Sequence, residues 1–298
     1  MNKAVKIIGI ICSIFIIHLA FTGNANADVK IGVLAKRGAA KSMKKWGATA
    51  TYLSQKIGTE CSVIPLQFSA IEPAVASKKI DFILANPAFF VELEKKYKTR
   101  AISTMINSSG GQALKDFGGV IFVTKESPIK TLADIKGKSF MCVKRSSLGG
   151  AHMAWRLLLE NGIDPEKDTS AFLEGGKHDN VVLAVKNGTV DVGTVRSDTL
   201  ERMQDEKKIR LSDFRILNQI EDDFPFVHST RRYPEWPMAA LASTDKALAN
   251  KVAAALQKMS IFDPAAKAAK IIGWTAPADY TPVADCLRAI KYGAFANE

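Results

Sequence analysis

The sequence predicts an α/β fold in which two Rossmann-like lobes, joined by a hinge, enclose a cleft. Short apolar runs alternate with segments whose apolar residues have helical spacing, which is typical of parallel sheets covered by helices. Two irregular crossings, near 108–119 and 221–229, separate these segments into two groups. We therefore expect lobe I to comprise residues 28–117 and 222–298, and lobe II to comprise residues 118–221.

The first lobe begins with a strand, because apolar residues alternate over 29–34. Apolar residues three or four apart then define one helical face from Met43 to Ile57, and Gly58 is expected to end that helix. A second helix begins at Asn86, a good N-cap, with Pro87 in its first turn. The remaining elements of this block are strands at 61–66, 81–85 and 100–106 and a short helix at 71–80.

The second group repeats the alternation after the glycine-rich crossing. Its expected strands are 120–125, 139–144, 170–174, 191–195 and 214–219, and its expected helices are 148–162, 178–188 and 197–208. After the second crossing, a helix over 243–260 places Leu248, Val252, Leu256 and Met259 on one face.

Residues 1–27 have the pattern of a secretory signal peptide, with two lysines before an apolar run over 7–21 and small residues before Ala27. We expect export, with cleavage between Ala27 and Asp28. The apolar run is shorter than the roughly 20 residues of a membrane-spanning helix, and an uncleaved anchor is the alternative.

The rest of the chain is basic, since removing residues 1–27 lowers the formal charge only from +11 to +9, through Lys3 and Lys6. A basic exported protein is expected to meet an anionic ligand or a polyanionic surface, and solvated surface lysines are the simpler alternative. No nucleic-acid partner is expected, because the chain is exported and has no basic–aromatic recognition motif.

Three cysteines remain after residue 27, namely Cys61, Cys142 and Cys286. Their odd number and wide spacing predict neither a disulfide framework nor a zinc site. One disulfide or three buried thiols both remain open, and no cofactor is predicted.

The segment 145–155, RSSLGGAHMAW, places two hydroxyls and two glycines directly before a predicted helix. The simpler interpretation is an N-cap by Ser146 or Ser147, worth about 1 kcal/mol. The alternative is that these hydroxyls and the free N–H groups near Gly149 bind an anion at the helix start. The segment is not a Walker loop, because the GxxxxGK[ST] spacing is absent.

Polar, basic and aromatic residues follow several predicted strands, and the carboxyl ends of strands meet at the cleft of such folds. Arginine in particular suits a bidentate grip on oxoanions. The candidates are Lys36, Arg37, Asn86, Phe89, His178, Arg196, Thr230, Arg231 and Tyr233. Each lysine or arginine alone is better explained as a surface residue, but their recurrence predicts an anion site. Trp46 or Phe89 would form a wall of the site or pack in the core.

Catalysis is not expected. Ser146, His178 and Asp179 could be combined into a triad, but the G-x-S-x-G elbow is absent and side chains of adjacent residues diverge. The histidines have no metal-binding spacing, so no metal site is predicted.

Four segments together resemble the phosphate-, phosphite- and phosphonate-binding periplasmic proteins of ABC transporters: DFILANPAFFVELEKKY, SPIKTLADIKGKSF, SSLGGAHMAWRLLLENGIDPEKD and GGKHDNVVLAVKNGTVDVGTV. The resemblance implies a type II periplasmic-binding-protein fold. It also implies that hydroxyls at a helix start and the histidine of a G-x-H-D motif hold the oxoanion. In this sequence those residues are Ser146, Ser147 and His178.

The sequence departs from the phosphonate binders at two points, with Phe89 and Phe90 where they have tyrosine and SSLGG where they have STSG. Four other segments are closer to the extracytoplasmic sensor domains of histidine kinases of the tetrathionate-sensor type: IGVLAKRG, VRSDTLERM, HSTRRYPEWP and GWTAPADYTPV. In that group Lys36, Arg37, Arg196 and Arg231 would supply positive charge for an anion with few hydrogen-bond donors.

The resemblance thus predicts a periplasmic protein that captures a small oxoanion, either phosphonate-, phosphite- or phosphate-like or a sulfur oxyanion. It would deliver this ligand to an ABC permease or, alternatively, present it to a sensor histidine kinase. An exported hydrolase is the third interpretation.

Overall fold

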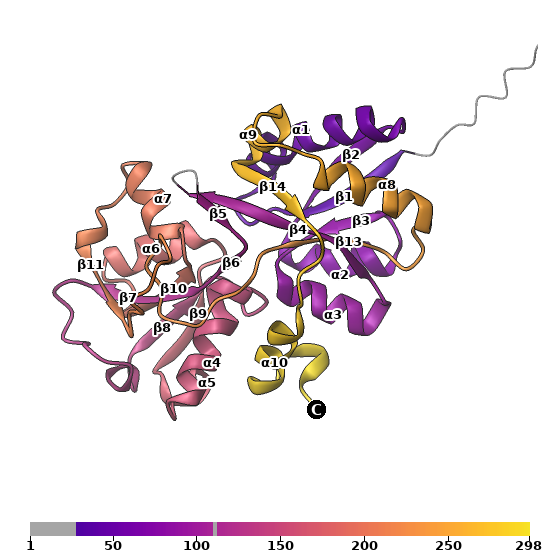
Figure 1. Ribbon diagram of the computed structural model, residues 1–298. Helices are drawn as coiled ribbons and strands as arrows, with labels where there is room; N and C mark the ends of the chain where they lie inside the picture. Colours follow the sequence, from indigo (N-terminus) through magenta and orange to yellow (C-terminus); the bar gives the residue numbers. More distant parts are fainter. Residues whose placement is uncertain (1–27, 110–111) are drawn as a thin grey trace, which may run out of the picture.

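The computed structural model describes residues 28–109 and 112–298. The predicted signal peptide, residues 1–27, lies outside the described residues. Two α/β lobes lie side by side, and the chain passes from one to the other and back (Figure 1). The predicted α/β class is therefore confirmed.

Lobe I contains a mixed sheet with strand order β14–β4–β13–β3–β1–β2, and β5 pairs with β4. Strand β1 is parallel to β2 and β3, whereas β13 is antiparallel to β3 and β4. The strands are β1 (Val29–Leu34), β2 (Cys61–Leu66), β3 (Phe82–Leu84), β4 (Arg100–Ser109), β5 (Gln112–Leu114), β13 (Pro237–Ala240) and β14 (Ile271–Thr275). The segment after the second crossing thus returns to complete the first sheet.

Helices cover this sheet, and capping residues determine where they begin and end. Gly58 ends the first helix with φ 70°, a left-handed conformation that glycine adopts without strain. Asn86 caps another, because its Oδ1 accepts hydrogen bonds from the N–H groups of Ala88 and Phe89. The helices are α1 (Ala39–Ile57), α2 (Ile71–Ala76), α3 (Pro87–Tyr97), α8 (Lys246–Gln257), α9 (Pro264–Ala269) and α10 (Thr281–Ala289).

Lobe II contains a second sheet with strand order β11–β7–β10–β8–β9. Strands β8, β9 and β10 are parallel, whereas β7 is antiparallel to β10 and β11. The strands are β7 (Gly119–Thr124), β8 (Ser139–Cys142), β9 (Ala171–Glu174), β10 (Val192–Arg196) and β11 (Phe214–Leu217). The helices are α4 (Met153–Glu160), α5 (Pro165–Asp168), α6 (His178–Lys186) and α7 (Thr199–Asp205), and a π-helical turn, Leu148–His152, precedes α4. Separate apolar clusters form the cores of lobe II.

The two crossings run antiparallel to each other, since β6 (Asp116–Phe117) pairs with β12 (Tyr233–Pro234). The residues before β12 are still hydrogen-bonded to lobe II, because Ser229 Oγ accepts from the N–H of Ile121 and Thr230 Oγ1 accepts from that of Gly119. We therefore propose that the second crossing lies at β12, later than the boundary at residue 222 that the sequence suggests.

None of the helices within 28–109 and 112–298 is long and apolar enough to cross a membrane. In this described part of the chain, Cys61, Cys142 and Cys286 are buried and form no disulfide. These thiols therefore contribute to the cores as apolar side chains.

Candidate ligand-binding site

A small cavity lies between the lobes, with a volume of about 10 Å³, space for about one water molecule. Lobe I contributes residues at the ends of β1 and β2, at the start of α3 and before β13. Lobe II contributes the π-helical turn, the start of α6 and the end of β10. The lining residues are Leu34, Lys36, Phe68, Asn86, Phe117, Ser147, Gly149, His178, Arg196 and Trp236. A cavity of this size is too small for an oxoanion, so we expect the lobes to separate when such a ligand enters.

Arg196 is the most firmly held charged residue of the cavity. It ends β10 and is only 4% exposed. Its Nη2 donates to Glu235 Oε1 at 2.8 Å, and its Nε lies 3.4 Å from Asp198 Oδ1. The guanidinium carbon lies 4.1 Å from the centre of the Phe117 ring. These contacts fix the orientation of the guanidinium, and its Nη1 has no hydrogen-bond partner among the described residues.

Two carboxylates stand behind Arg196. Glu235 is fully buried and also accepts from Asn107 Nδ2 at 3.1 Å. Asp198 has φ 80°, and its left-handed backbone turns the chain directly after Arg196. Burial acts to raise the pKa of Asp198, but the positive charges of Arg196 and Lys36 outweigh it and leave the pKa below its usual value. Both carboxylates neutralise Arg196, and neither lines the cavity.

Two lysines of lobe I face Arg196. Lys36 follows β1, and its Nζ lies 5.4 Å from the centre of the Trp236 ring. Burial lowers the pKa of Lys36 to about 7, and the charge of Arg196 acts in the same direction. Burial also lowers the pKa of Lys45, on α1, to about 8. An anion in the cavity would relieve the repulsion between these cations.

His178 presents a hydrogen-bond donor to the cavity. Its Nδ1 accepts from the backbone N–H of Arg196 at 3.4 Å, so the ring proton lies on Nε2. Burial holds the pKa of His178 well below its ordinary value, and the ring is neutral at physiological pH. Nε2 has no hydrogen-bond partner within the described part of the chain.

The π-helical turn brings its backbone close to Arg196 and Phe117. Ser147 Oγ accepts from the N–H of Gly150 at 3.2 Å and caps the turn. A Cβ on Gly149 would lie 2.7 Å from the Cβ of Arg196 and 2.8 Å from the ring of Phe117. Only glycine fits there, and Gly149 and Ser147 bring the start of the turn into the lining of the cavity.

Three predicted site residues are not among the lining residues. Trp46 packs in the core against Trp274, with ring centres 6.2 Å apart. Phe89 packs on the lining residue Phe68, also at 6.2 Å. The carbonyl of Ser146 accepts from Asn86 Nδ2 at 3.3 Å and so joins the two lobes.

The other four predicted residues are not brought into the cavity. Thr230 bonds the backbone of β7, and the hydroxyl of Tyr233 accepts from Arg156 Nη1 at 3.3 Å. Arg231 is largely exposed and pairs with Glu160 on α4 at 2.7 Å. Arg37 pairs with two carboxylates of lobe II.

Sequence reasoning missed several residues of the site. Lys45 lies outside the lining, but it is close enough to Arg196 for that charge to lower its pKa, and its place directly before the buried Trp46 was the available signal. Glu235 and Trp236 lie between β12 and β13, two short strands that have no clear period. Leu34, Phe68 and Phe117 resemble ordinary core residues in sequence.

The family comparison agrees with this two-lobed arrangement. Residues 31–283 match the model of the family described as ABC transporter, phosphonate, periplasmic substrate-binding protein. The chain belongs to this family. Members of a periplasmic substrate-binding family are extracytoplasmic, so the chain is assigned to that side of the membrane.

The chain is also 31% identical over 286 residues to the tetrathionate sensor histidine kinase TtrS of Salmonella typhimurium (strain LT2). The match covers 95% of this chain but 46% of that protein, so the chain spans about half the length of this relative.

Two solved structures establish the type II periplasmic-binding-protein fold. PhnD1 from Prochlorococcus marinus (MIT 9301), in complex with methylphosphonate, has a TM-score of 0.72 and 16% identity, covering 89% of this chain and 98% of that one. A binding protein of an ABC phosphonate transporter from Pseudomonas aeruginosa has a TM-score of 0.72 and 17% identity, covering 90% and 91%. The family and these neighbours are substrate-binding proteins.

Proposed function

We propose that this periplasmic substrate-binding protein captures a small oxoanion between its lobes and delivers it to an ABC permease. The oxoanion is phosphonate-, phosphite- or phosphate-like or a sulfur oxyanion. The observation that carries the proposal is the convergence of Lys36 from lobe I with Arg196 and His178 from lobe II on one cavity. Each brings a hydrogen-bond donor, and the start of the π-helical turn adds backbone N–H groups.

The charge arrangement supports an anionic ligand. Asp198 and Glu235 are bonded to Arg196 on the side away from the lining, so no carboxylate lines the cavity among the described residues. A cationic or zwitterionic solute would therefore have no carboxylate to meet, whereas an oxoanion would meet donors from both lobes.

Hydrolysis is not proposed, because the geometry of His178 opposes it. In a Ser–His–Asp triad the histidine Nδ1–H donates to the carboxylate, whereas here Nδ1 accepts from the Arg196 N–H. The neighbouring Asp179 is instead bonded to Arg37, Arg202 and Lys208.

A second candidate function is sensing, in which the anion-bound protein docks on a histidine kinase. The identity to the sensor kinase TtrS, 31% over nearly the whole chain, supports it. Sensing predicts that an anion increases binding of the chain to the periplasmic region of a kinase, measured by calorimetry. Transport instead predicts that the anion increases binding of the chain to a permease complex.

The proposal is tested by thermal denaturation of protein purified from the periplasm. Mass spectrometry of the same protein is expected to show that the chain begins at Asp28. The panel comprises phosphate, phosphite, methylphosphonate, sulfate, thiosulfate and tetrathionate. A ligand at 100 times its Kd adds about 2.7 kcal/mol to the free energy of unfolding, so a true ligand raises the melting temperature clearly. A neutral or cationic solute that raises it while no anion does would contradict the proposal.

A further inference from the structure

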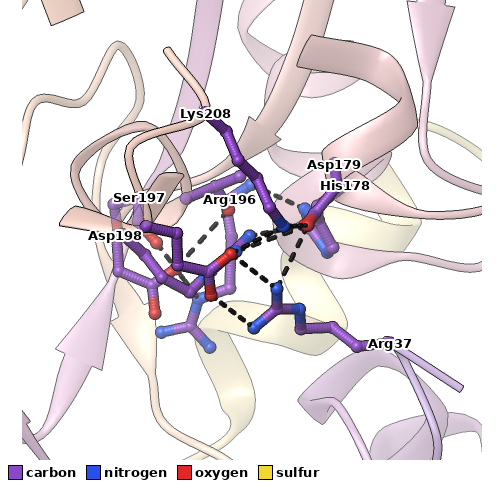
Figure 2. A network of polar contacts seen from close by, with 10 residues as sticks. Arg37, His178, Asp179, Arg196, Ser197, Asp198 and Lys208 are labelled. Carbon is purple, nitrogen blue, oxygen red and sulfur yellow. Dashed lines mark hydrogen bonds and ion pairs between the residues drawn. The ribbon is translucent and has the colours of Figure 1, made fainter. Parts of the chain in front are cut away.

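Arg37 connects the lobes through two carboxylates and does not line the cavity. It directly follows Lys36 at the end of β1 in lobe I. Its Nη2 donates to Asp179 Oδ2 at 3.1 Å and to Glu206 Oε2 at 3.0 Å, and its Nη1 lies 3.0 Å from Glu206 Oε1. Figure 2 shows the Arg37 guanidinium directed at the Asp179 carboxylate, with Lys208 approaching from the other side.

The carboxylates are organised by lobe II itself. Arg202 Nη2 lies 2.6 Å from Asp179 Oδ1, and Lys208 Nζ lies 3.1 Å from Asp179 Oδ2 and 2.7 Å from Glu206 Oε2. Partial burial opposes ionisation of Glu206, but Arg37 and the lobe II cations outweigh it and lower its pKa to about 2. Asp179 also has a pKa below its usual range, because Arg202, Lys208 and Arg37 outweigh the effect of burial. Both acceptors are therefore ionised and held in place at neutral pH.

The position of this network ties it to closure of the cleft. Arg37 is the chain neighbour of Lys36, and Asp179 is the chain neighbour of His178, and both neighbours line the cavity. A movement that brings Lys36 and His178 together around a ligand therefore also brings Arg37 to Asp179.

We propose that Arg37, Asp179 and Glu206 form an interlobe latch that sets how long the closed protein retains its ligand. This inference rests on the proposed function of the cavity. The three are positioning residues, because they act through closure of the lobes and do not touch the ligand. The alternative is the role that the sequence predicts, in which Arg37 contacts the anion directly.

Arg37→Gln is expected to raise the ligand dissociation rate about 5- to 20-fold and to change the association rate little, because a smaller fraction of the complex is closed. The increase in dissociation rate should be the same for every anion that binds, since the latch does not contact the ligand. Stopped-flow fluorescence measures both rates, with Trp236 in the cavity as a reporter. Added salt should reduce the difference in dissociation rate between the variant and the original protein, because it screens the ion pairs of Arg37.

Arg210→Gln is the matched control, because Arg210 loses the same charge but pairs with Asp213, three residues away within lobe II. It should leave both rates unchanged. Glu206→Gln should raise the dissociation rate, and the double variant with Arg37→Gln should raise it by less than the product of the two factors.

The latch is contradicted if Arg37→Gln releases ligand as slowly as Arg210→Gln does. It is also contradicted if its effect differs strongly between anions, which would place Arg37 on the ligand. If no anion binds the original protein, the proposed function fails, and small-angle scattering then tests the latch alone. Arg37→Gln should have the larger radius of gyration of the two variants, and equal radii would overturn the latch.

Discussion

Replacing Arg196 with methionine should abolish oxoanion binding, with a loss of affinity of at least about 100-fold, and should destabilise the fold. The affinity falls because a charged, oriented donor in the cavity is removed. The free energy of unfolding falls by about 3–5 kcal/mol, because Glu235 is left as a buried carboxylate without its partner. Calorimetric titration measures the first effect, and urea denaturation measures the second.

A second variant separates these effects. Arg196→Met combined with Glu235→Gln removes the uncompensated charge, so it should recover most of the stability while binding stays lost. Arg215→Met is the control, since within residues 28–109 and 112–298 Arg215 bonds only the carbonyls of Ser127, Ile129 and Lys125. A stable Arg196 variant that binds the anion within tenfold of the original affinity would show that Arg196 is not a ligand residue.

Oxoanion affinity should fall as the pH rises above about 7, because Lys36 loses its proton there in the ligand-free protein. Below that pH the ammonium is present in both the free and the bound protein, so the affinity is constant. Above it, binding requires uptake of a proton, and the affinity falls by up to about tenfold per pH unit until the pKa in the complex is reached. Calorimetry at pH 8 in buffers of different ionisation enthalpy measures this uptake, after correction for ionisation of the ligand.

Lys36→Met should bind the anion more weakly and with no such pH dependence, whereas Lys30→Met, on the exposed side of the same strand, should behave as the original protein does. The free energy of unfolding of the ligand-free protein should instead rise as the pH rises. Lys36 has an ordinary pKa of 10.5 and a folded-state pKa of about 7, so the unfolded chain binds more protons between these values and stability rises with pH. The same affinity at pH 6 and pH 9 would contradict this role of Lys36.

The elements that sequence predicts well are those whose cause is local. Strand β2, Cys61–Leu66, has the predicted bounds, and α1 and α3 end or begin at Gly58 and Asn86 as expected. In each case the pattern of side chains and the terminal residue specify the element without any distant partner.

The elements that were not predicted depend on distant segments. The crossing near 108–119 was expected to be irregular, yet it contains β6, which exists because β12 pairs with it from more than a hundred residues away. Strand β14 was also missed. It includes Gly273, where a Cβ would lie 2.7 Å from the carbonyl oxygen of Met259, so its path is set by tertiary packing.

The site divides in the same way. Lys36 follows β1 and Arg196 ends β10, and both line the cavity, because the ends of these strands meet there and can be read from the sequence. Arg37 is one residue further on and points to Asp179, because adjacent side chains diverge. The carboxylate of Glu235, which orients Arg196, follows a two-residue strand and had no sequence signal.

The central claim, that an oxoanion is held between the lobes, is tested most directly by a crystal structure of the chain with the anion that stabilises it most. The claim predicts the anion in the interlobe cavity, with its oxygens about 2.7–3.2 Å from Arg196, His178 Nε2 and Lys36 Nζ. An anion bound only elsewhere, such as the basic groove of lobe II that includes Lys207 and Arg210, would contradict it.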